Sequence, residues 1–382
     1  MTLRVAIVTE SFLPSLNGVT NSVLRVLDTF RQQGHEAVII APSAPAPKHL
    51  GFDVIRTASV PLMQFPVAVP GLWLRGALEK FNPDVIHVAS PFMLGGQAIV
   101  AAERMGVPSV AIYQTALTGY LDRYNMTVAK PLLDRITANI HAPATLNLAP
   151  TQEAADYLQS LGVKRVAVWG RGVDLDLYHP NRKLEAETAE LRASFAKPQE
   201  RIVGYVGRLA AEKQVHRMAE LFDLPNTRFV IVGDGPERKK LEADFAAKPV
   251  TFTGRLSGIE LARAYATFDA FVHFGTEETF GQTIQEAQAS GLPVVAPESG
   301  GPRWLIESGS TGFLVHPSKK HAYHKPVKHL LDDATLRARI GEQARRAVLL
   351  KSWEANNAQL IEHYRGAMEL NRIQRAAALA VA

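Results

Sequence analysis

The segment TEETFGQTIQEA, residues 276–287, decides the expected fold because a strand pattern ends just before it and a helix pattern begins inside it. The apolar run Ala270–Phe274 predicts a buried strand, and the small and apolar residues of Thr283–Ala289 predict a helix. A strand end, a tight turn and a helix N-terminus form an anion site, since the backbone N–H groups of the first helical turn point outward. Here those N–H groups would come from Phe280, Gly281, Gln282 and Thr283.

Two carboxylates, Glu278 and Glu286, flank this turn with seven residues between them. We expect Glu278, which precedes the helix, to face the anion site. Glu286 lies about one turn inside the helix, where a carboxylate can accept paired hydrogen bonds from vicinal hydroxyls. Phosphate together with a polyol describes a nucleotide sugar. The structural alternative is that Glu278 caps the helix and stabilises its dipole, while Glu286 is an exposed helix charge.

The rest of the chain repeats the order strand, helix, strand. A helix is expected from about Thr20 to Gln33, ended by Gly34, and further strands are expected at 4–8, 36–42, 83–89, 109–113, 144–149, 166–169, 201–206, 228–232 and 250–255. This order implies right-handed crossovers and mostly parallel sheets. We therefore predict an α/β protein with two Rossmann-like, doubly wound domains that face a central cleft.

Length and composition limit the function classes. A chain of 382 residues, 47% of them hydrophobic, is too long for one ordinary core and suits two domains. The absence of cysteine excludes disulfides, thiolate chemistry and zinc–thiolate sites. The start of the chain has no signal-peptide pattern, and no uninterrupted apolar run reaches transmembrane length. We therefore expect a cytoplasmic protein.

The net charge of +5 and the pI near 9.3 are compatible with anionic ligands. No run of Lys and Arg with interleaved aromatic residues marks a nucleic-acid surface, so no nucleic-acid partner is expected. The turn after the first strand lacks Gly-x-Gly-x-x-Gly and offers only Asn17-Gly18, which argues against an NAD dehydrogenase. His87, inside an apolar strand pattern, is interpreted as a packed histidine.

The run EAQASGLPV, residues 286–294, with Glu278 ahead of it, resembles the C-terminal signature of retaining glycosyltransferases of the GT-B fold, family four. In that family two glutamates separated by seven residues precede Ala-x-Ala-x-Gly-x-Pro-Val. The resemblance implies an acceptor-binding N-terminal domain over 1–172 and a donor-binding domain over 173–352. It also implies that a helix over about 353–382 crosses back to the first domain.

Arg208 and Lys213 follow Gly207 at an expected strand-to-helix turn, and the family carries Gly-Arg, four residues and Lys at this place. Without the resemblance, the two cations would be taken for solvated surface residues. An arginine fork and a lysine point charge suit a diphosphate. The resemblance implies that both neutralise the leaving group, that Glu278 holds the sugar and favours positive charge at its anomeric carbon, and that no enzymic base is needed. Glu286 would hold the ribose, and the segment 253–259, with Gly254 and Arg255, would meet the base.

The first domain carries weaker signals. The resemblance implies that Gly18 approaches the donor phosphate and the acceptor, with Asn17 beside it, although a plain turn glycine is the alternative. Many family members carry a histidine near Gln114; glutamine donates and accepts hydrogen bonds but does not titrate, which leaves a positioning role. Asp174-x-Asp176 is interpreted as a turn, because the GT-B fold stabilises diphosphate without a metal. Neither a metal nor a cofactor is expected.

The resemblance is closest to actinobacterial GDP-mannose-dependent α-mannosyltransferases that act on glycolipids. It is carried by Glu10–Pro14, Asn17–Val23, Trp169–Asp174, Glu278–Thr283 and Gly300–Arg303. It implies mannosyl transfer from GDP-mannose to a glycolipid or glycan hydroxyl. The alternatives are a UDP-sugar donor, a sugar-nucleotide epimerase, which Gln114 disfavours, and a catalytically silent sugar-binding relative, which the intact charged residues disfavour.

The stretch Leu62–Arg75 is apolar with basic flanks. Together with the net positive charge, it suggests contact with an anionic membrane surface, so that the protein would be peripheral at the inner face of the cell membrane. Ordinary core and loop packing of the same residues is the alternative.

Overall fold

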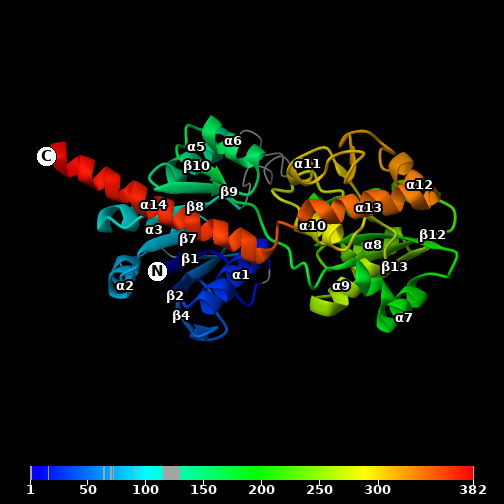
Figure 1. Cartoon of the computed structure of the whole chain (residues 1–382), viewed down its shortest axis with the longest axis horizontal. Coiled ribbons are helices and arrows are strands. Elements are labelled where there is room, and N and C mark those ends of the chain that lie inside the picture. Colours follow the sequence, from blue (N-terminus) through cyan, green and yellow to red (C-terminus); the bar gives the residue numbers. More distant parts are fainter. Residues whose placement is uncertain are drawn as a thin grey trace. The chain divides into compact units, whose positions relative to one another are not determined.

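The computed structural model describes residues 2–15, 17–62, 65–68, 71, 73–89, 91–114 and 130–381. The chain divides into two compact units, each built on its own sheet (Figure 1). Unit 1 consists of Met1–Arg171 together with Trp353–Ala382, and unit 2 consists of Gly172–Ser352.

The sheet of unit 1 has the strand order β10-β9-β8-β7-β1-β2-β4-β3. Every neighbouring pair is parallel except β3 and β4. The strands are β1 (Arg4–Val8), β2 (Glu36–Ala41), β3 (Lys48–His49), β4 (Phe52–Arg56), β7 (Val85–Val88), β8 (Ser109–Ile112), β9 (Leu146–Ala149) and β10 (Val166–Val168). A separate antiparallel hairpin joins β5 (Ser59–Leu62) to β6 (Phe65–Ala68).

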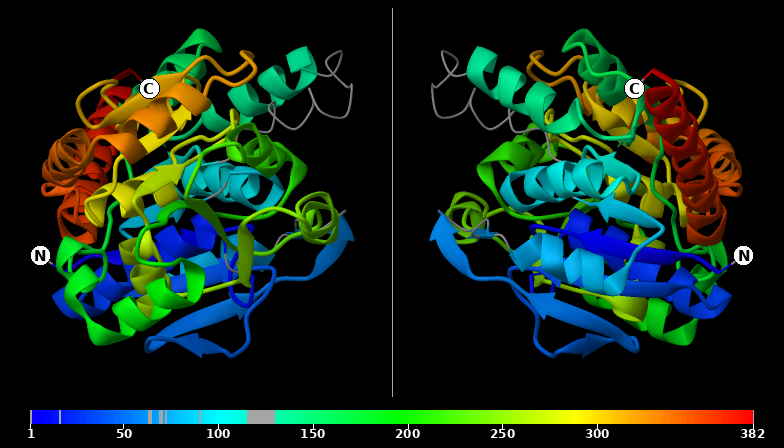
Figure 2. Two further views of the ribbon diagram at one scale, coloured as in Figure 1. Left: turned by 90° about the vertical axis from the view of Figure 1, so that its right-hand side faces the viewer. Right: turned by 90° about the vertical axis from the view of Figure 1, so that its left-hand side faces the viewer.

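Helices pack on both faces of this sheet because its strands are apolar on both sides (Figure 2). In β7, Val85 belongs to the core that includes α1 and α14, whereas Ile86 and Val88 belong to the core that includes α2 and α3. The helices of unit 1 are α1 (Gly18–Gln33), α2 (Trp73–Phe81), α3 (Met93–Met105), α5 (Lys130–His141), α6 (Gln152–Ser160) and α14 (Trp353–Val381).

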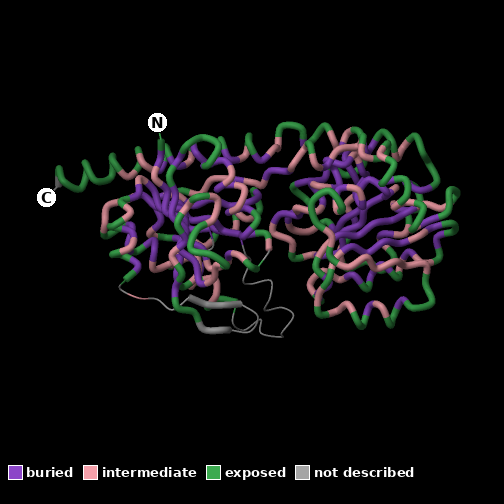
Figure 3. Tube along the Cα trace, turned by 90° about the horizontal axis from the view of Figure 1, so that it is seen from below, coloured by how far each residue is buried: buried purple, intermediate pink, exposed green. Residues whose placement is uncertain are grey.

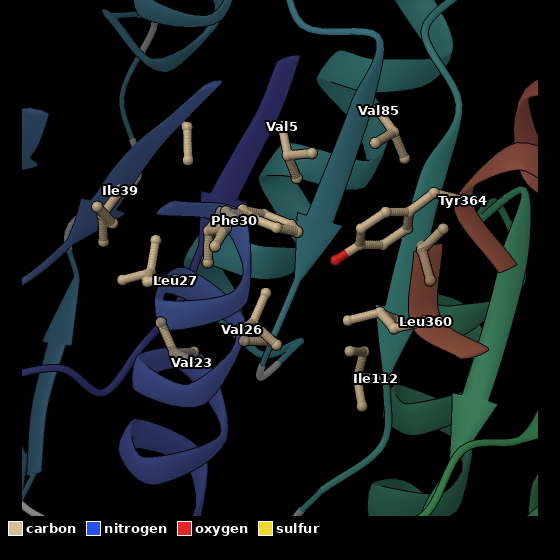
Figure 4. Packing of buried hydrophobic residues seen from close by; sticks show 14 of the residues in the cluster. Val5, Val23, Val26, Leu27, Phe30, Ile39, Val85, Ile112, Leu360 and Tyr364 are labelled. Carbon is tan, nitrogen blue, oxygen red and sulfur yellow. The ribbon is translucent and has the colours of Figure 1, made fainter. Parts of the chain in front are cut away.

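Helix α14 returns to unit 1 and completes its core, as expected for the last helix. Leu360 and Tyr364 are fully buried there among residues of α1 and β7 (Figure 4). The Tyr364 hydroxyl lies 2.5 Å from Nδ1 of His87. Burial lowers the pKa of His87 to about 3, so this histidine is a neutral, packed strand residue, as predicted.

In the sheet of unit 2 the described strands follow the order β13-β12-β11-β14-β15-β16, and all neighbours are parallel. They are β11 (Arg201–Val206), β12 (Thr227–Val232), β13 (Val250–Gly254), β14 (Ala270–Val272), β15 (Val294–Pro297) and β16 (Gly312–Val315). The α-helices are α7 (Ala186–Phe195), α8 (Arg238–Asp244), α9 (Gly258–Thr267), α10 (Gln282–Ala289), α11 (Gly301–Leu305), α12 (His324–Asp332) and α13 (Ala334–Val348).

Short 3-10 helices connect several of these elements: η3 (Pro180–Leu184), η4 (Ala211–Lys213) and η5 (Val215–Leu221). Two apolar cores cover the two faces of the sheet, and Figure 3 shows buried residues filling the interior of each unit. In β12, Val230 and Val232 belong to one core, and Phe229 and Ile231 to the other. The sheet is therefore buried on both faces, and its loops are the parts free to form a site.

The predicted fold class is confirmed by these two parallel, doubly wound sheets and by the long C-terminal helix. The strand predictions agree with the structure to within a few residues, and the helix at the decisive segment begins at Gln282 rather than at Thr283. The turn after β11 differs from the expectation, because two 3-10 helices replace the predicted α-helix there.

Candidate functional site

Strand order in unit 2 reverses between β11 and β14. From β11 the chain builds the sheet to one side through β12 and β13, and from β14 it builds to the other side through β15 and β16. Because the strands are parallel, the loops after β11 and β14 leave the same edge and diverge. Ligands of open α/β sheets bind in the crevice at such a reversal, outside the carboxyl ends of the strands.

At this reversal Lys213 meets Glu278. Lys213 ends η4, after β11, and Glu278 lies in the loop after β14. The Nζ atom of Lys213 is 2.6 Å from Oε2 of Glu278, and the two side chains are 24% and 21% exposed. A second contact joins the same loops, since Nε2 of Gln214 donates to Oγ1 of Thr276 over 2.9 Å. The cation and the carboxylate that the sequence singled out are thus brought together.

The backbone between Glu278 and α10 is shaped by glycines. Gly281, at φ +98°, precedes the first helical residue, and its carbonyl accepts from the backbone N–H of Ile284. The N–H of Gly301 donates to the Glu278 carbonyl over 2.6 Å. A Cβ atom on Gly300 would lie 2.5 Å from that carbonyl oxygen, so a larger residue would displace the loop.

Among the four residues expected to present N–H groups, Phe280 has its side chain buried in the core of unit 2. It can therefore face a ligand only through its backbone. The side chain of Gln282 is also engaged, because Nε2 donates to the carbonyl of Gly172 over 3.1 Å. The first turn of α10 thus offers backbone N–H groups rather than side chains.

Glu286 is held by a tyrosine that the sequence analysis did not identify. The hydroxyl of Tyr265, from α9, donates to Oε2 of Glu286 over 2.9 Å. Tyr265 is fully buried, and burial together with the negative charge of Glu286 raises its pKa well above the usual value. The tyrosine therefore keeps its proton and orients the carboxylate.

Arg208 is exposed after β11, and its carbonyl accepts from the Tyr205 hydroxyl over 3.2 Å. The loop after β12 lies close beside this turn. A Cβ atom on Gly233, which has φ +140°, would lie only 1.9 Å from the Gly207 carbonyl oxygen. Glycine at this position thus lets the backbone of two loops pass in contact at the carboxyl edge.

Gly254, with φ +78°, ends β13, and the exposed Arg255 follows it at the same edge. The strand order puts β13 two strand spacings from β11, or about 10 Å. Gly254 and Arg255 thus lie at the same carboxyl edge of the sheet as the loops that carry Lys213 and Glu278.

Three candidate residues lie in unit 1. The side chain of Asn17 caps α1, because Oδ1 accepts from the N–H groups of Val19 and Thr20, each over 3.0 Å. Gly18 is the first residue of that helix. Gln114 follows β8 and is 7% exposed; its Oε1 accepts from Nη2 of Arg171 over 3.0 Å. In unit 2, Oδ1 of Asp174 accepts from the backbone N–H of Leu177 over 2.9 Å, which agrees with the predicted turn.

Comparison with known families decides the classification. Residues 16–177 match the model described as Glycosyltransferase Family 4, and residues 187–347 match Glycosyl transferases group 1. The chain is 44% identical over 372 residues to the GDP-mannose-dependent alpha-mannosyltransferase of Mycolicibacterium smegmatis, covering 95% of this chain and 97% of the relative. It is 41% identical to the protein of the same name from Corynebacterium glutamicum, covering 97% of this chain and 90% of the relative. The chain belongs to glycosyltransferase family 4.

A more distant relative is the sulfoquinovosyl transferase SQD2 of Arabidopsis thaliana, 31% identical over 94% of this chain and 72% of the relative. Solved structures with similar folds include the sucrose-phosphate synthase of Thermosynechococcus elongatus. It has a TM-score of 0.78 and 21% identity, covering 95% of this chain and 98% of that one. The Anabaena protein HepE in complex with UDP has a TM-score of 0.76 and 21% identity, covering 95% of this chain and 100% of that one. The predicted family, the GT-B fold and the glycosyltransferase activity are thereby confirmed.

His273 lies beside the Lys213–Glu278 pair, and the sequence reasoning did not single it out. It follows β14 and is buried, with Nε2 4.0 Å from Oε2 of Glu278. Its carbonyl accepts from the Tyr323 hydroxyl over 2.9 Å. Burial lowers the pKa of His273 to about 4, a shift to which the charge of Lys213 adds and which the charge of Glu278 opposes. The imidazole is therefore neutral beside the ion pair at neutral pH.

We predict that His273→Gln makes stability less sensitive to acid. The folded pKa is about 4 and the unfolded value about 6.5, so the unfolded chain takes up this proton first as the pH falls. The stability that the neutral imidazole contributes is present above pH 6.5 and is lost between pH 6.5 and 4. Between pH 7.5 and 5, the wild type should lose about 2 kcal/mol more unfolding free energy than the variant. Urea unfolding at both pH values measures this, and equal losses would show that His273 does not titrate in this way.

Proposed function

We propose that this chain is a retaining α-mannosyltransferase that moves mannose from GDP-mannose to a hydroxyl of a glycolipid or glycan. The observation that carries the proposal is the similarity to relatives named GDP-mannose-dependent alpha-mannosyltransferase. Three of them match at 44%, 41% and 42% identity, over 95%, 97% and 95% of this chain. In this proposal unit 2 binds the donor and unit 1 binds the acceptor.

The leaving GDP would be stabilised at the strand-order reversal of unit 2. Charge builds on the departing phosphate as its bond to the anomeric carbon breaks, and groups that are already oriented toward it lower the barrier. Lys213 supplies an ammonium there, held by Glu278 at 2.6 Å. The first-turn N–H groups of α10 and the guanidinium of Arg208 complete the positive surroundings.

The reaction would take place on one face of the sugar. The bond between the anomeric carbon and the phosphate oxygen breaks, and the acceptor oxygen bonds to the same face. The acceptor proton passes to an oxygen of the departing phosphate, so no enzymic base is required. The carboxylate of Glu278 would hold sugar hydroxyls and stabilise the positive charge that develops at the anomeric carbon.

The nucleoside would extend along the carboxyl edge of the sheet. Glu286 would accept hydrogen bonds from the ribose hydroxyls. A carboxylate has about four acceptor positions, so the bond from Tyr265 orients it and leaves capacity for a ligand. The base would lie toward Gly254 and Arg255, whose loop follows β13.

Unit 1 would position the sugar and the acceptor. Gly18, the first residue of α1, would approach the donor phosphate and the acceptor through its main chain, while the side chain of Asn17 holds that turn by capping the helix. The buried amide of Gln114 would contact a substrate hydroxyl. It cannot act as a titrating acid or base, which is consistent with a transfer that uses the leaving phosphate as the base.

Turnover of GDP-mannose with a glycolipid extract tests the proposal. We predict that the wild type releases GDP, and that Glu278→Gln and Lys213→Met each lower kcat by about 100- to 1,000-fold, the usual cost of removing one group that stabilises the transition state. Glu277→Gln, the exposed neighbour, is the matched control and should retain activity. GDP should raise the melting temperature of the wild type, whereas NAD should not. Transfer from UDP-glucose in preference to GDP-mannose would overturn the donor assignment, and full activity of Glu278→Gln would overturn the site.

A glycolipid acceptor would bring the protein to a membrane surface. None of the described helices is long and apolar enough to span a bilayer. One more distant relative, 27% identical, is named a phosphatidylinositol dimannoside mannosyltransferase. In the stretch 62–75, Trp73 at the start of α2 is 37% exposed; residues 63, 64, 69, 70 and 72, and the side chains of Leu62 and 65–68, lie outside the described part. We infer a peripheral protein at the inner face of the cell membrane.

Sedimentation with vesicles checks this inference. We predict that the protein sediments with vesicles containing anionic phospholipid at low salt and much less with neutral phosphatidylcholine vesicles, because its net charge is +5. Trp73→Ser should weaken sedimentation, with Trp304→Ser, another exposed tryptophan, as the control in unit 2. If the same fraction of the protein sedimented with anionic and with neutral vesicles, charge-driven membrane binding would be ruled out.

A further inference from the structure

Arg171 contacts Gln114 in a way that fixes the orientation of the glutamine amide. The two residues are 57 positions apart, and Nη2 of Arg171 donates to Oε1 of Gln114 over 3.0 Å. A guanidinium has only donors, so the oxygen of the amide, and not its NH₂ group, must face it. The NH₂ group of Gln114 is consequently directed away from Arg171. Without the arginine, the amide could turn over and present its oxygen in that direction instead.

Gly18 makes room for this arginine. An ideal Cβ atom on Gly18 would lie 2.4 Å from Nη1 of Arg171 and 3.1 Å from Nη2, so any larger residue would push the guanidinium aside. Glycine is costly at a helical position, and the φ of Gly18 is not in the left-handed region, so close approach is the reason that the structure offers for it.

The segment that carries Arg171 is itself anchored in unit 1. Trp169, two residues earlier, is buried, and its Nε1 donates to the carbonyl of Asn356 on α14 over 2.9 Å. Gln114 is 93% buried at the end of β8. Residues from the start of α1, the end of β8 and the segment after β10 therefore meet at one guanidinium, and each is constrained by its own element.

We propose that Arg171 is a positioning residue for mannosyl transfer, which holds the Gln114 amide so that it donates an N–H to a hydroxyl oxygen of the bound sugar. The inference rests on the proposed function, in which Gln114 contacts substrate. Glutamine thus becomes a donor of fixed direction, as a neutral histidine would be with a fixed tautomer. Arg171 acts through Gln114 and makes no contact with the sugar of its own in this account.

A double-mutant cycle tests the proposal. The variants are Arg171→Met, Gln114→Ala and the double variant, and Arg165→Met is the control, since Arg165 also donates to an oxygen of unit 1, the carbonyl of Ala144 over 2.9 Å. We predict that Arg171→Met and Gln114→Ala each lower kcat/KM for GDP-mannose by about 2- to 10-fold, the factor for one hydrogen bond between neutral groups. The double variant should be no worse than Gln114→Ala alone, and the control should retain activity.

Gln114→Glu separates positioning from structural support. Glutamate keeps an acceptor for Arg171, so the melting temperature should be maintained, but it has no N–H to donate, so activity should fall as in Gln114→Ala. Affinity for GDP, which lacks the mannosyl group, should be unchanged in every variant by isothermal titration calorimetry. A loss of GDP affinity, or an active Gln114→Glu, would contradict the proposed role of the amide.

The cycle also separates this inference from the proposed function. Suppose that the wild type transfers mannose and that Arg171→Met lowers kcat/KM by the same factor in the wild type and in Gln114→Ala. Arg171 then acts independently of Gln114, and only the inference fails. If the wild type turns over another nucleotide sugar instead, the donor assignment fails, and the same cycle is run with that sugar. If it turns over none, the proposed function fails and the inference falls with it.

Discussion

The reversal of strand order between β11 and β14 is the constraint on which the site of unit 2 depends. Two neighbouring parallel strands end at one edge, and their loops leave in opposite directions, which is the arrangement at which open α/β sheets bind ligands. Lys213, from one of these loops, lies 2.6 Å from Glu278 of the other. Ion pairs of this kind, with both side chains about a quarter exposed or less, contribute little to the free energy of unfolding. The value of this pair lies in placing a cation and an anion where a phosphate and a sugar would meet.

The same geometry recurs in unit 1, where strand order reverses between β1 and β7. Glu10, from the loop after β1, accepts from the backbone N–H groups of Leu94 and Gly95 at the start of α3, over 2.5 and 3.3 Å. A carboxylate from the loop after β1 therefore accepts from N–H groups in the first turn of α3, the helix that follows β7. The two units use the same arrangement differently: in the proposed function the first turn of α10 in unit 2 would meet a ligand, while in unit 1 the side chain of Glu10 already contacts the first turn of α3.

Local pattern was enough to predict much of the fold, because buried parallel strands are short apolar runs and the helix ends are marked by residues such as Gly34. The amphipathic helices α12 and α13 were not predicted, although Val327, Leu330 and Leu331 recur at helical spacing. Sequence motifs singled out Lys213, Glu278 and Glu286, and the structure brings the first two of them into contact. Tyr265, His273 and Arg171 were missed because each acts through a contact that only the folded chain creates. Tyr265 is 21 positions from the glutamate it orients, and Arg171 is 57 positions from Gln114.

We expect unit 2 to bind a nucleoside diphosphate at the reversal between β11 and β14. A crystal structure of the protein with GDP tests this most directly. We predict that the diphosphate lies beside Nζ of Lys213 and the first turn of α10, with the ribose hydroxyls on Glu286 and the base toward Gly254. A diphosphate bound elsewhere, with the Lys213–Glu278 pair unchanged and remote from it, would contradict this placement.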